Sequence, residues 1–165
     1  MSRGRALKFG NDISTDQIIP SKYLSSWADN IAELAKHAME DADPAFVNKV
    51  KPGDFVVGGE SFGIGSSREQ APLVLKTVGI SAVLERSVAR IFFRNAINVG
   101  LPVLLCDTEK VADGDELEVD LEAGIIRNIT KGIQVNFTPL PQVMISILNE
   151  GGLVPYVKKY GAFKL

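Results

Sequence analysis

Cysteine and histidine are nearly absent from this sequence. Its 165 residues include one of each, Cys106 and His37. A lone cysteine cannot form a disulfide framework, and it cannot provide the several thiolates that hold a structural zinc ion or an iron–sulfur cluster. The shortage of imidazole and thiol groups also removes Ser-His-Asp and Cys-His catalysis from the expected chemistry.

Long apolar runs and a strong excess of charge are absent as well. No run approaches the roughly 18 apolar residues of a membrane span, and Lys8, Asn11 and Asp12 interrupt the start before the apolar core of a secretory signal can form. The 18 basic and 20 acidic residues leave a net charge of −2, which gives no general reason to bind nucleic acid or an anionic membrane. We therefore expect a cytoplasmic protein without nucleic-acid or membrane partners.

The sequence does contain enough apolar material for a core. Hydrophobic residues make up 45% of the chain, so disorder is not expected. The length suits one compact domain, and no internal repeat, low-complexity tract or linker divides it. We expect a single domain over residues 1–165.

The middle of the chain alternates apolar strands with helices. One helix is expected to follow a glycine-rich loop and to run to about Val78, where Gly79 ends it. A second helix is expected at 87–98, and strands are expected at 55–57, 81–84 and 103–105. This alternation predicts parallel strand pairing with right-handed crossovers.

The two ends of the chain show other patterns. Near the start, residues 5–9 read as a strand and residues 30–40 as an amphipathic helix with His37 on its solvated face. After the turn at 113–115, three strands at 116–121, 125–129 and 133–138 predict an antiparallel meander, and a last helix is expected at 141–149. The expected fold class is α/β, with parallel and antiparallel sheet and a sheet-on-sheet part.

The glycine-rich loop, residues 58–68, is the main candidate for chemistry. Gly63 and Gly65 permit a close approach of the backbone to a ligand, and N–H groups at the start of a helix attract anions. The loop lacks the lysine of a Walker loop, and Arg68 stands where a dinucleotide fingerprint needs its third glycine. We therefore expect an anion other than a nucleotide phosphate, and the fork of Arg68 suits a carboxylate.

Helix capping is a simpler explanation of the same loop. Ser66 and Glu69 have the spacing of a capping box. Pro72 weakens this explanation, because it disfavours helical geometry at Ala71 and lacks an N–H group, so the helix is expected to kink or to begin near Pro72. From these residues alone, an anion site and a plain cap both stay open.

Three segments together resemble the aconitase superfamily. They are Gly63-Ile-Gly-Ser-Ser-Arg-Glu-Gln-Ala-Pro72, Asp12-Ile-Ser-Thr-Asp-Gln-Ile-Ile-Pro20 with the following Tyr23-Leu24, and Arg90-Ile-Phe-Phe-Arg-Asn-Ala-Ile-Asn-Val-Gly-Leu-Pro102. Their spacing and the chain length are similar to those of the isopropylmalate dehydratase small subunits. The resemblance implies the three-layer β/β/α swivelling domain that forms domain 4 of aconitase.

The resemblance assigns roles to five residues. Enzymes of this family remove water from, and return it to, hydroxy acids that carry two or more carboxylates. Ser66 matches the base that takes the proton alpha to a carboxylate, and Asp16 matches an active-site aspartate with an orienting role. Gly65 and Ser67 would hydrogen-bond the substrate, and Arg68 would clamp a carboxylate. A serine base needs concentrated positive potential, which the loop N–H groups and Arg68 would supply.

The resemblance also implies a cofactor and a partner outside this chain. The family uses a 4Fe–4S cluster whose open iron takes the leaving hydroxide, and three cysteines of a large subunit hold it. Cys106 ends the expected strand 103–105 and reads as a core residue. We therefore expect no metal site in this chain, and activity only together with an aconitase-like large subunit.

The segment after Pro20 selects the substrate in this family. Tyr23, Leu24, Ser25 and Ser26 are the expected contacts, and serines stand where related subunits often carry arginine. An uncharged segment favours 3-isopropylmalate, interconverted with 2-isopropylmalate in leucine biosynthesis, over a tricarboxylate. A dimethylmalate, homoaconitate or methylcitrate-type dehydratase stays open, as does a stand-alone anion-binding regulatory module.

Three arginines recur every four residues. Arg86, Arg90 and Arg94 are expected to form a stripe on one helix face. The stripe is either an ordinary surface or interface feature, or a cationic flank of the substrate cleft.

Overall fold

Within residues 1–163, which the computed structural model describes, seven strands form one mixed sheet. The strands are β1 (Ser2–Lys8), β2 (Phe55–Val57), β3 (Ala82–Glu85), β4 (Val103–Leu105), β5 (Glu116–Asp120), β6 (Ile125–Asn128) and β7 (Ile133–Asn136). Their order is β4-β3-β2-β1-β5-β6-β7. Residues Ala6–Lys8 of β1 pair in parallel with β2, and residues Ser2–Arg5 pair in antiparallel with β5. β1 therefore joins a parallel half to an antiparallel half. The parallel pairing predicted for the middle of the chain and the antiparallel meander predicted after residue 115 are both confirmed.

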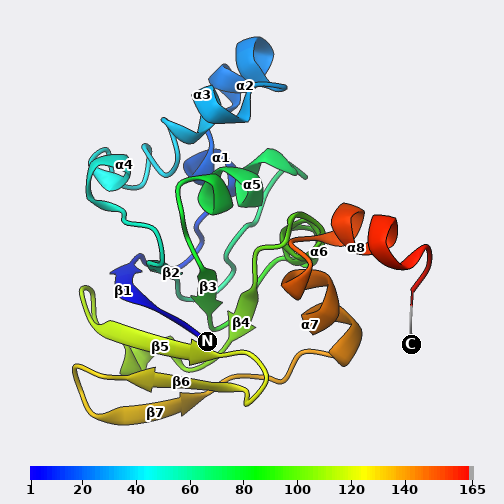
Figure 1. The fold of residues 1–165 in the computed structure, drawn as a ribbon. Coiled ribbons are helices and arrows are strands. Elements are labelled where there is room, and N and C mark those ends of the chain that lie inside the picture. The colour runs from blue at the N-terminus through cyan, green and yellow to red at the C-terminus, as the bar shows by residue number, and fades with distance from the viewer. Residues whose placement is uncertain (164–165) are drawn as a thin grey trace.

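The helices lie mainly over one side of the parallel half. They are α1 (Thr15–Ile18), α2 (Ser21–Trp27), α3 (Ile31–Ala35), α4 (Phe46–Lys49), α5 (Gln70–Thr77), α6 (Arg90–Val99), the 3₁₀ helix η1 (Thr108–Lys110), α7 (Gln142–Asn149) and α8 (Leu153–Tyr160). Figure 1 shows α1 to α5 gathered at one end of the molecule, β5 to β7 at the opposite end, and α7 and α8 beside α6. In residues 1–163, none of the helices has the length and apolar character needed to cross a bilayer.

Successive residues of the parallel strands face two different cores, because side chains alternate along a strand. Val56, Val83 and Val103 are buried among the helices. Val57, Leu84 and Leu104 face the other way. There they pack against apolar side chains of the antiparallel half: Leu117, Val119, Ile126 and Val135.

The sheet curls so far that its two edges meet. Cys106, directly after β4, forms an antiparallel bridge with Phe137, directly after β7. The N–H of Thr138 also donates to the carbonyl of Leu105 at 2.9 Å. The predicted three-layer β/β/α arrangement is confirmed, and its two β layers are the halves of this one curled sheet.

The predicted helix at 30–40 is wrong in its second half. α3 ends at Ala35, and Met39 has a positive φ of 59°. The reason is a tertiary hydrogen bond, in which the N–H of Met39 donates to the carbonyl of Ile18 at 2.8 Å instead of continuing the helix. The predicted apolar stripe is nevertheless buried at Leu34, Ala35, Ala38 and Met39.

Four helices were not predicted: α1, α2, α4 and α8. The first three have four to seven residues, too few for a clear helical period. α8 follows Gly151-Gly152, a pair of residues that in the sequence favours the end of the preceding helix. Gly152 instead begins α8 at φ +132°, in a place where a Cβ would lie 2.6 Å from the carbonyl oxygen of Asn98.

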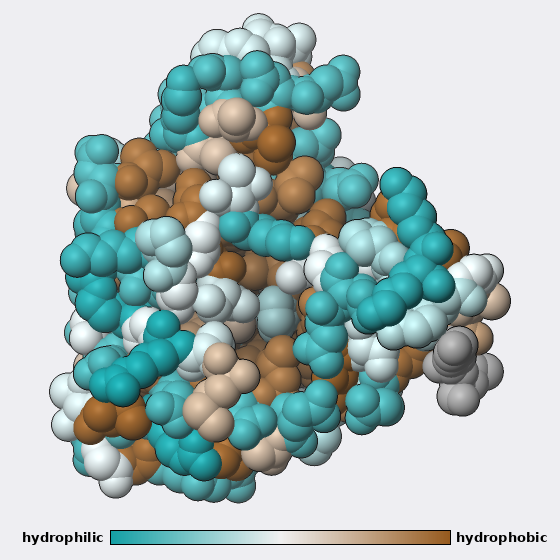
Figure 2. Space-filling view, viewed as in Figure 1, coloured by the Kyte–Doolittle hydropathy of each residue, from teal (hydrophilic) through white to brown (hydrophobic). Residues whose placement is uncertain are grey.

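The face shown in Figure 2 is hollowed near its centre. Apolar residues are visible in this hollow, between the helices at the top of the view and the antiparallel strands at the bottom, and polar residues surround it. The candidate site lies at the ends of β1 and β2, where the chain leaves the parallel half.

Candidate active site

Two chain segments meet at the end of the parallel strands. The segment after β1, residues 13–16, lies beside the glycine-rich loop. The N–H of Gly63 donates to the carbonyl of Ile13 at 2.7 Å, and the N–H of Thr15 donates to the carbonyl of Ile64 at 2.8 Å. Ser14 and Ile64 also form a parallel bridge. Two of the three motif segments are therefore joined by backbone hydrogen bonds.

A capping box sets the geometry of the first segment. The Ser14 hydroxyl accepts from the N–H of Gln17 at 3.2 Å, and the Ser14 N–H donates to the side-chain oxygen of Gln17 at 2.9 Å. This turn buries Thr15, which is 3% exposed, and leaves Asp16 on the surface beside the loop. The pattern Ser-x-x-Gln of residues 14–17 is the local sequence signal of this cap.

Gly63 is required by close packing against α6. Its φ is +75°, and a Cβ at this position would lie 2.3 to 2.8 Å from carbons of the Phe92 side chain. Real Cβ atoms do not approach other atoms so closely, so only glycine fits. The loop is thereby held against the helix that carries the third motif segment.

Ser66 and Ser67 are exposed and do not cap the following helix. α5 begins at Gln70, and its N-cap Glu69 makes no side-chain capping bond. The plain-cap explanation of Ser66 is therefore wrong. Pro72 accounts for this late start, because the first turn of a helix tolerates a residue without an N–H group.

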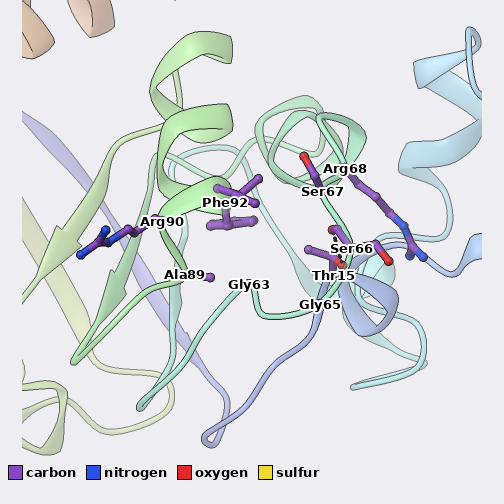
Figure 3. Close-up of a pocket in the computed structure, with 10 residues that line it drawn as sticks. Thr15, Gly63, Gly65, Ser66, Ser67, Arg68, Ala89, Arg90 and Phe92 are labelled. Carbon is purple, nitrogen blue, oxygen red and sulfur yellow. Dashed lines mark hydrogen bonds between the residues drawn. The ribbon is translucent and has the colours of Figure 1, made fainter.

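Thr15 fixes the position of Ser66. Its hydroxyl donates to the Ser66 carbonyl at 2.9 Å, drawn as a dashed line in Figure 3. Among the described residues, no protein acceptor pairs with the backbone N–H of Gly65, Ser66 or Ser67. These N–H groups are available to an anion. Thr15 was not among the predicted site residues, although it lies inside the motif segment.

Arg68 and Asp16 form an ion pair across the two segments. Arg68 Nη1 donates to Asp16 Oδ1 at 2.6 Å and to the carbonyl of Ile19 at 3.1 Å. The Arg68 side chain is 12% exposed and that of Asp16 is 58% exposed. The hydrogen bond from Arg68 lowers the pKa of Asp16, and hydrogen bonds from Ser21 at the start of α2 lower it further. Asp16 therefore connects the glycine-rich loop to α2, and its orienting role stays a prediction.

A pocket of about 320 Å³ opens between the loop and the start of α6. Thr15, Gly63 and residues 65–68 line one side, and residues 89–92 line the other. In Figure 3, Ser66 and Ser67 lie on the loop side of this pocket, and the Arg90 side chain points away from them. The structure thus brings together four of the predicted residues, Gly65, Ser66, Ser67 and Arg68, with Asp16 behind them.

The predicted substrate-choice residues do not line this pocket. Tyr23 and Leu24 are half-buried against the helical core, and Ser25 and Ser26 are exposed on α2. The Ser25 hydroxyl donates to the carbonyl of Lys22 at 3.2 Å. They are connected to the pocket indirectly, through Asp16 and through the bond of Arg68 to Ile19.

The predicted stripe of three arginines is wrong. α6 begins at Arg90, so Arg86 precedes the helix, and its side chain instead forms ion pairs with Glu60 and Glu109. Arg90 lines the pocket, whereas Arg94 lines a separate apolar groove between α6, α7 and α8. A helix period counted from sequence alone could not locate the boundary at Ala89.

His37 is not on a solvated helix face, contrary to the prediction. Its ring stacks on Tyr23 with centroids 3.8 Å apart, and its Nδ1 lies 2.7 Å from Glu40 Oε2. The shortened α3 explains the difference, because residues 36–39 form turns that direct His37 towards α2.

Cys106 lies in the core region as predicted. It is half-buried beside the second core, and burial, together with the nearby Glu85 and Asp107 carboxylates, raises the pKa of its thiol to about 12. Within residues 1–163, no three His, Cys, Asp or Glu residues gather in a group that would hold a metal ion. The residues of this chain do not fit a 4Fe–4S cluster, which needs several thiolates.

Comparisons with known proteins agree with the motif segments. Residues 11–108 match the aconitase C-terminal domain family. The "3-isopropylmalate dehydratase small subunit 2" of Archaeoglobus fulgidus is 61% identical over 98% of each chain. The "isopropylmalate/citramalate isomerase small subunit" of Methanocaldococcus jannaschii is 55% identical over 95% of this chain and 94% of that one.

A solved structure gives the same result for the fold. The crystal structure of 3-isopropylmalate dehydratase from Methanocaldococcus jannaschii superposes with a TM-score of 0.92 at 46% identity, covering 96% of this chain and 94% of that one. Similarity of this extent in both sequence and fold shows the family. The chain belongs to the small subunits of 3-isopropylmalate dehydratase, in the aconitase superfamily.

Proposed function

We propose that this chain is the small subunit of a two-subunit hydro-lyase that interconverts 3-isopropylmalate and 2-isopropylmalate in leucine biosynthesis. The observation that carries the proposal is the arrangement of Ser66 beside free loop N–H groups and the Arg68–Asp16 pair, at the mouth of a pocket. The names of the relatives support the substrate class.

Ser66 is the proposed base. It removes the proton from the substrate carbon alpha to a carboxylate, and it returns a proton in the reverse direction. An unaided serine hydroxyl is too weak an acid for this role. The unpaired N–H groups of Gly65 and Ser67 place partial positive charge around it, which stabilises the alkoxide form.

Arg68 and Ser67 are the proposed carboxylate ligands. One nitrogen of the Arg68 guanidinium is occupied by Asp16 and by the Ile19 carbonyl. The remaining N–H donors of the fork are free for a carboxylate of the substrate. Asp16 holds the guanidinium in place, so that less conformational freedom is lost when the substrate binds.

The leaving hydroxide needs a Lewis acid, which this chain does not provide. We propose that a 4Fe–4S cluster on an aconitase-like large subunit supplies this chemistry when the two subunits assemble. In this proposal residues 1–165 act as one swivelling domain in the cytoplasm, and the active site lies between the subunits.

The substrate's variable group is proposed to contact α2. Leu24 presents apolar surface there, and Ser25 and Ser26 carry no charge that would neutralise a third carboxylate. Burying an unpaired carboxylate costs several kcal/mol, whereas an isopropyl or methyl group gains about 0.8 kcal/mol per buried CH₂-sized group. The proposal therefore extends to methyl-substituted malates such as dimethylmalate and citramalate, and ranks them above homoaconitate and methylcitrate-type substrates.

The test is reconstitution followed by a substrate panel. The chain would be co-expressed with an aconitase-like large subunit from the same genome, and the complex would be isolated and supplied with iron and sulfide. The panel comprises 3-isopropylmalate, citramalate, dimethylmalate, homocitrate and citrate, each followed by the ultraviolet absorbance of the unsaturated product. Turnover greatest on 3-isopropylmalate supports the proposal. A chain that forms no complex with this large subunit and converts none of these acids would point instead to the stand-alone anion-binding regulatory module.

A further inference from the structure

A stack of three aromatic rings joins α2 to the segment after α3. The rings of Tyr23 and Trp27 lie one helical turn apart, with centroids 5.6 Å apart and planes at 12°. The His37 ring lies 3.8 Å from Tyr23 and 5.6 Å from Trp27, again almost parallel to both. Within the described residues, these are the ring-to-ring contacts that α2 makes with another segment.

One carboxylate binds three side chains around this stack. Glu40 Oε1 accepts from the Tyr23 hydroxyl at 2.6 Å and lies 3.2 Å from Lys22 Nζ, and its Oε2 lies 2.7 Å from His37 Nδ1. Burial alone would raise the pKa of Glu40, but these three hydrogen bonds outweigh burial and lower it. Through Lys22 and Tyr23, Glu40 therefore connects α2 to the turns at residues 36–40.

Apart from these contacts, α2 is held by the partly buried side chains of Tyr23, Leu24 and Trp27, which pack against the helical core. It has seven residues, none of them fully buried, and its N-cap Pro20 makes no side-chain capping bond. A helix this short is not stable by itself in water. Its position therefore depends on this packing, on Glu40 and the aromatic stack, and on its junction with the preceding segment.

That junction leads to the active site. Arg68 donates to the carbonyl of Ile19, two residues before α2, and Ser21 hydrogen-bonds Asp16. The start of α2 is thus fixed by the catalytic loop, while its body is fixed by Glu40. Removing Glu40 would release the body of the helix and leave Arg68 and Ser66 in place.

We propose that Glu40 is a positioning residue for substrate preference: by binding Tyr23, His37 and Lys22 together, it holds α2 as a rigid wall against the variable group of the substrate. This inference rests on the proposed function, in which α2 faces that group. Glu40 itself touches neither the substrate nor Ser66.

The first test needs no activity. Trp27 is the only tryptophan of the chain, so its emission reports the stack directly. In Glu40→Ala we expect a red shift of the Trp27 emission and stronger quenching by acrylamide. Glu40→Gln, which keeps an oxygen for the Tyr23 hydroxyl but loses the charge that Lys22 and His37 meet, should fall between wild type and Glu40→Ala.

A matched control is available on the neighbouring helix. Glu33 forms an exposed ion pair with Lys36 and contacts none of the stacked rings. Glu33→Gln removes one carboxylate from the same region, and it should leave the Trp27 emission and the substrate preference unchanged.

The second test measures the KM and kcat of the reconstituted complex on 3-isopropylmalate and on citramalate, which differ in their variable group. For Glu40→Ala, KM for 3-isopropylmalate should rise about tenfold while kcat changes less than about twofold, since only binding of the variable group is affected. The preference for 3-isopropylmalate over citramalate should fall accordingly. If Glu40→Ala does not fold, Glu40→Gln provides the same comparison.

Three results would overturn the proposal. An unchanged Trp27 emission in both Glu40 variants means that Glu40 does not hold α2. An altered emission with an unchanged preference means that α2 does not face the variable group. If the wild-type complex converts no hydroxy acid, the proposed function and the role in preference both fail, but the Trp27 emission still decides whether Glu40 holds the helix.

Discussion

At the scale of single residues, substitution of Ser66 should affect turnover and leave the free energy of unfolding almost unchanged. Because Ser66 does not cap α5 and its side chain is exposed, its hydroxyl contributes little to folding. We expect Ser66→Ala to lower turnover of the reconstituted complex by about 10²–10⁴-fold, with a change in the free energy of unfolding below about 0.5 kcal/mol. Urea unfolding and steady-state kinetics on the same preparations would check both values. Near-normal turnover would rule out Ser66 as the base.

Replacement of Arg68 by lysine should weaken substrate binding. Its guanidinium bonds Asp16, the Ile19 carbonyl and, in our proposal, a substrate carboxylate at the same time. An ammonium cannot form this planar set of hydrogen bonds. We therefore expect Arg68→Lys to raise KM by about tenfold or more, measured in the same assay. A variant with unchanged KM would show that the guanidinium does not clamp the substrate.

Glu85 is a buried carboxyl group outside the proposed mechanism. It is 0% exposed, and among the described residues neither of its side-chain oxygens has a hydrogen-bond partner. Burial raises the pKa of Glu85 well above its ordinary value of 4.5. The folded state therefore holds the proton more tightly than the unfolded state. Its contribution to stability is complete below pH 4.5 and is lost as the pH rises towards the folded-state pKa.

Substitution of Glu85 should remove this pH dependence. We expect the free energy of unfolding of the wild type to decrease relative to that of Glu85→Gln, which has no titrating group, as the pH rises above the ordinary pKa of 4.5. Urea unfolding at several pH values would measure the difference. Glu33→Gln, at an exposed site, serves as the control and should follow the wild type. Parallel curves for wild type and Glu85→Gln would contradict the burial argument.

At the scale of elements, the position of the glycine-rich loop depends on its contact with α6. A Cβ at Gly63 would overlap the Phe92 side chain and would also require a positive φ. We expect Gly63→Ala to destabilise the protein by about 1–3 kcal/mol through this overlap, with loss of turnover because Ser66 moves with the loop.

Gly114 offers a control that separates the two effects of a new Cβ. Its φ is +81°, but no atom lies within 4 Å of the position that a Cβ would take. Gly114→Ala therefore measures the cost of the backbone conformation alone, and it should leave turnover unchanged. If the two alanine variants lose the same stability and both keep full turnover, packing against Phe92 is not what positions the loop.

The elements also show what could be predicted from sequence and what could not. β2, β3 and β4 are short, mainly apolar runs that each follow a glycine, and the helices between them predict their parallel pairing. The end of α3 could not be predicted, because it depends on the bond of Met39 to Ile18, a contact made only in the folded chain. In the candidate site, the motif predicted Ser66 and Arg68, whereas the hydrogen bonds of Thr15 and Glu40 join distant segments and are made only in the folded chain.

At the scale of the whole molecule, the curled sheet explains why a chain of this length presents its site at an edge. The antiparallel half covers one face of the parallel strands and the helices cover the other, so both cores are filled. The loops at the ends of the parallel strands remain accessible, as is usual for ligand sites in α/β sheets. The pocket beside Ser66 is consequently open on one side, as expected for a site that another subunit completes.

The isolated chain should therefore fold but be inactive. Its cores are complete without a partner, whereas its only cysteine is half-buried with a thiol pKa of about 12, which leaves almost no thiolate to bind iron near neutral pH. The purified chain should be colourless, without iron or acid-labile sulfide, and without dehydratase activity. Cys106→Ala should alter neither these values nor the turnover of the complex, because we expect Cys106 to be a core residue and not a metal ligand. Turnover by the chain alone in metal-free buffer would show that it contains a complete active site. The proposal that two subunits form the active site would then be wrong.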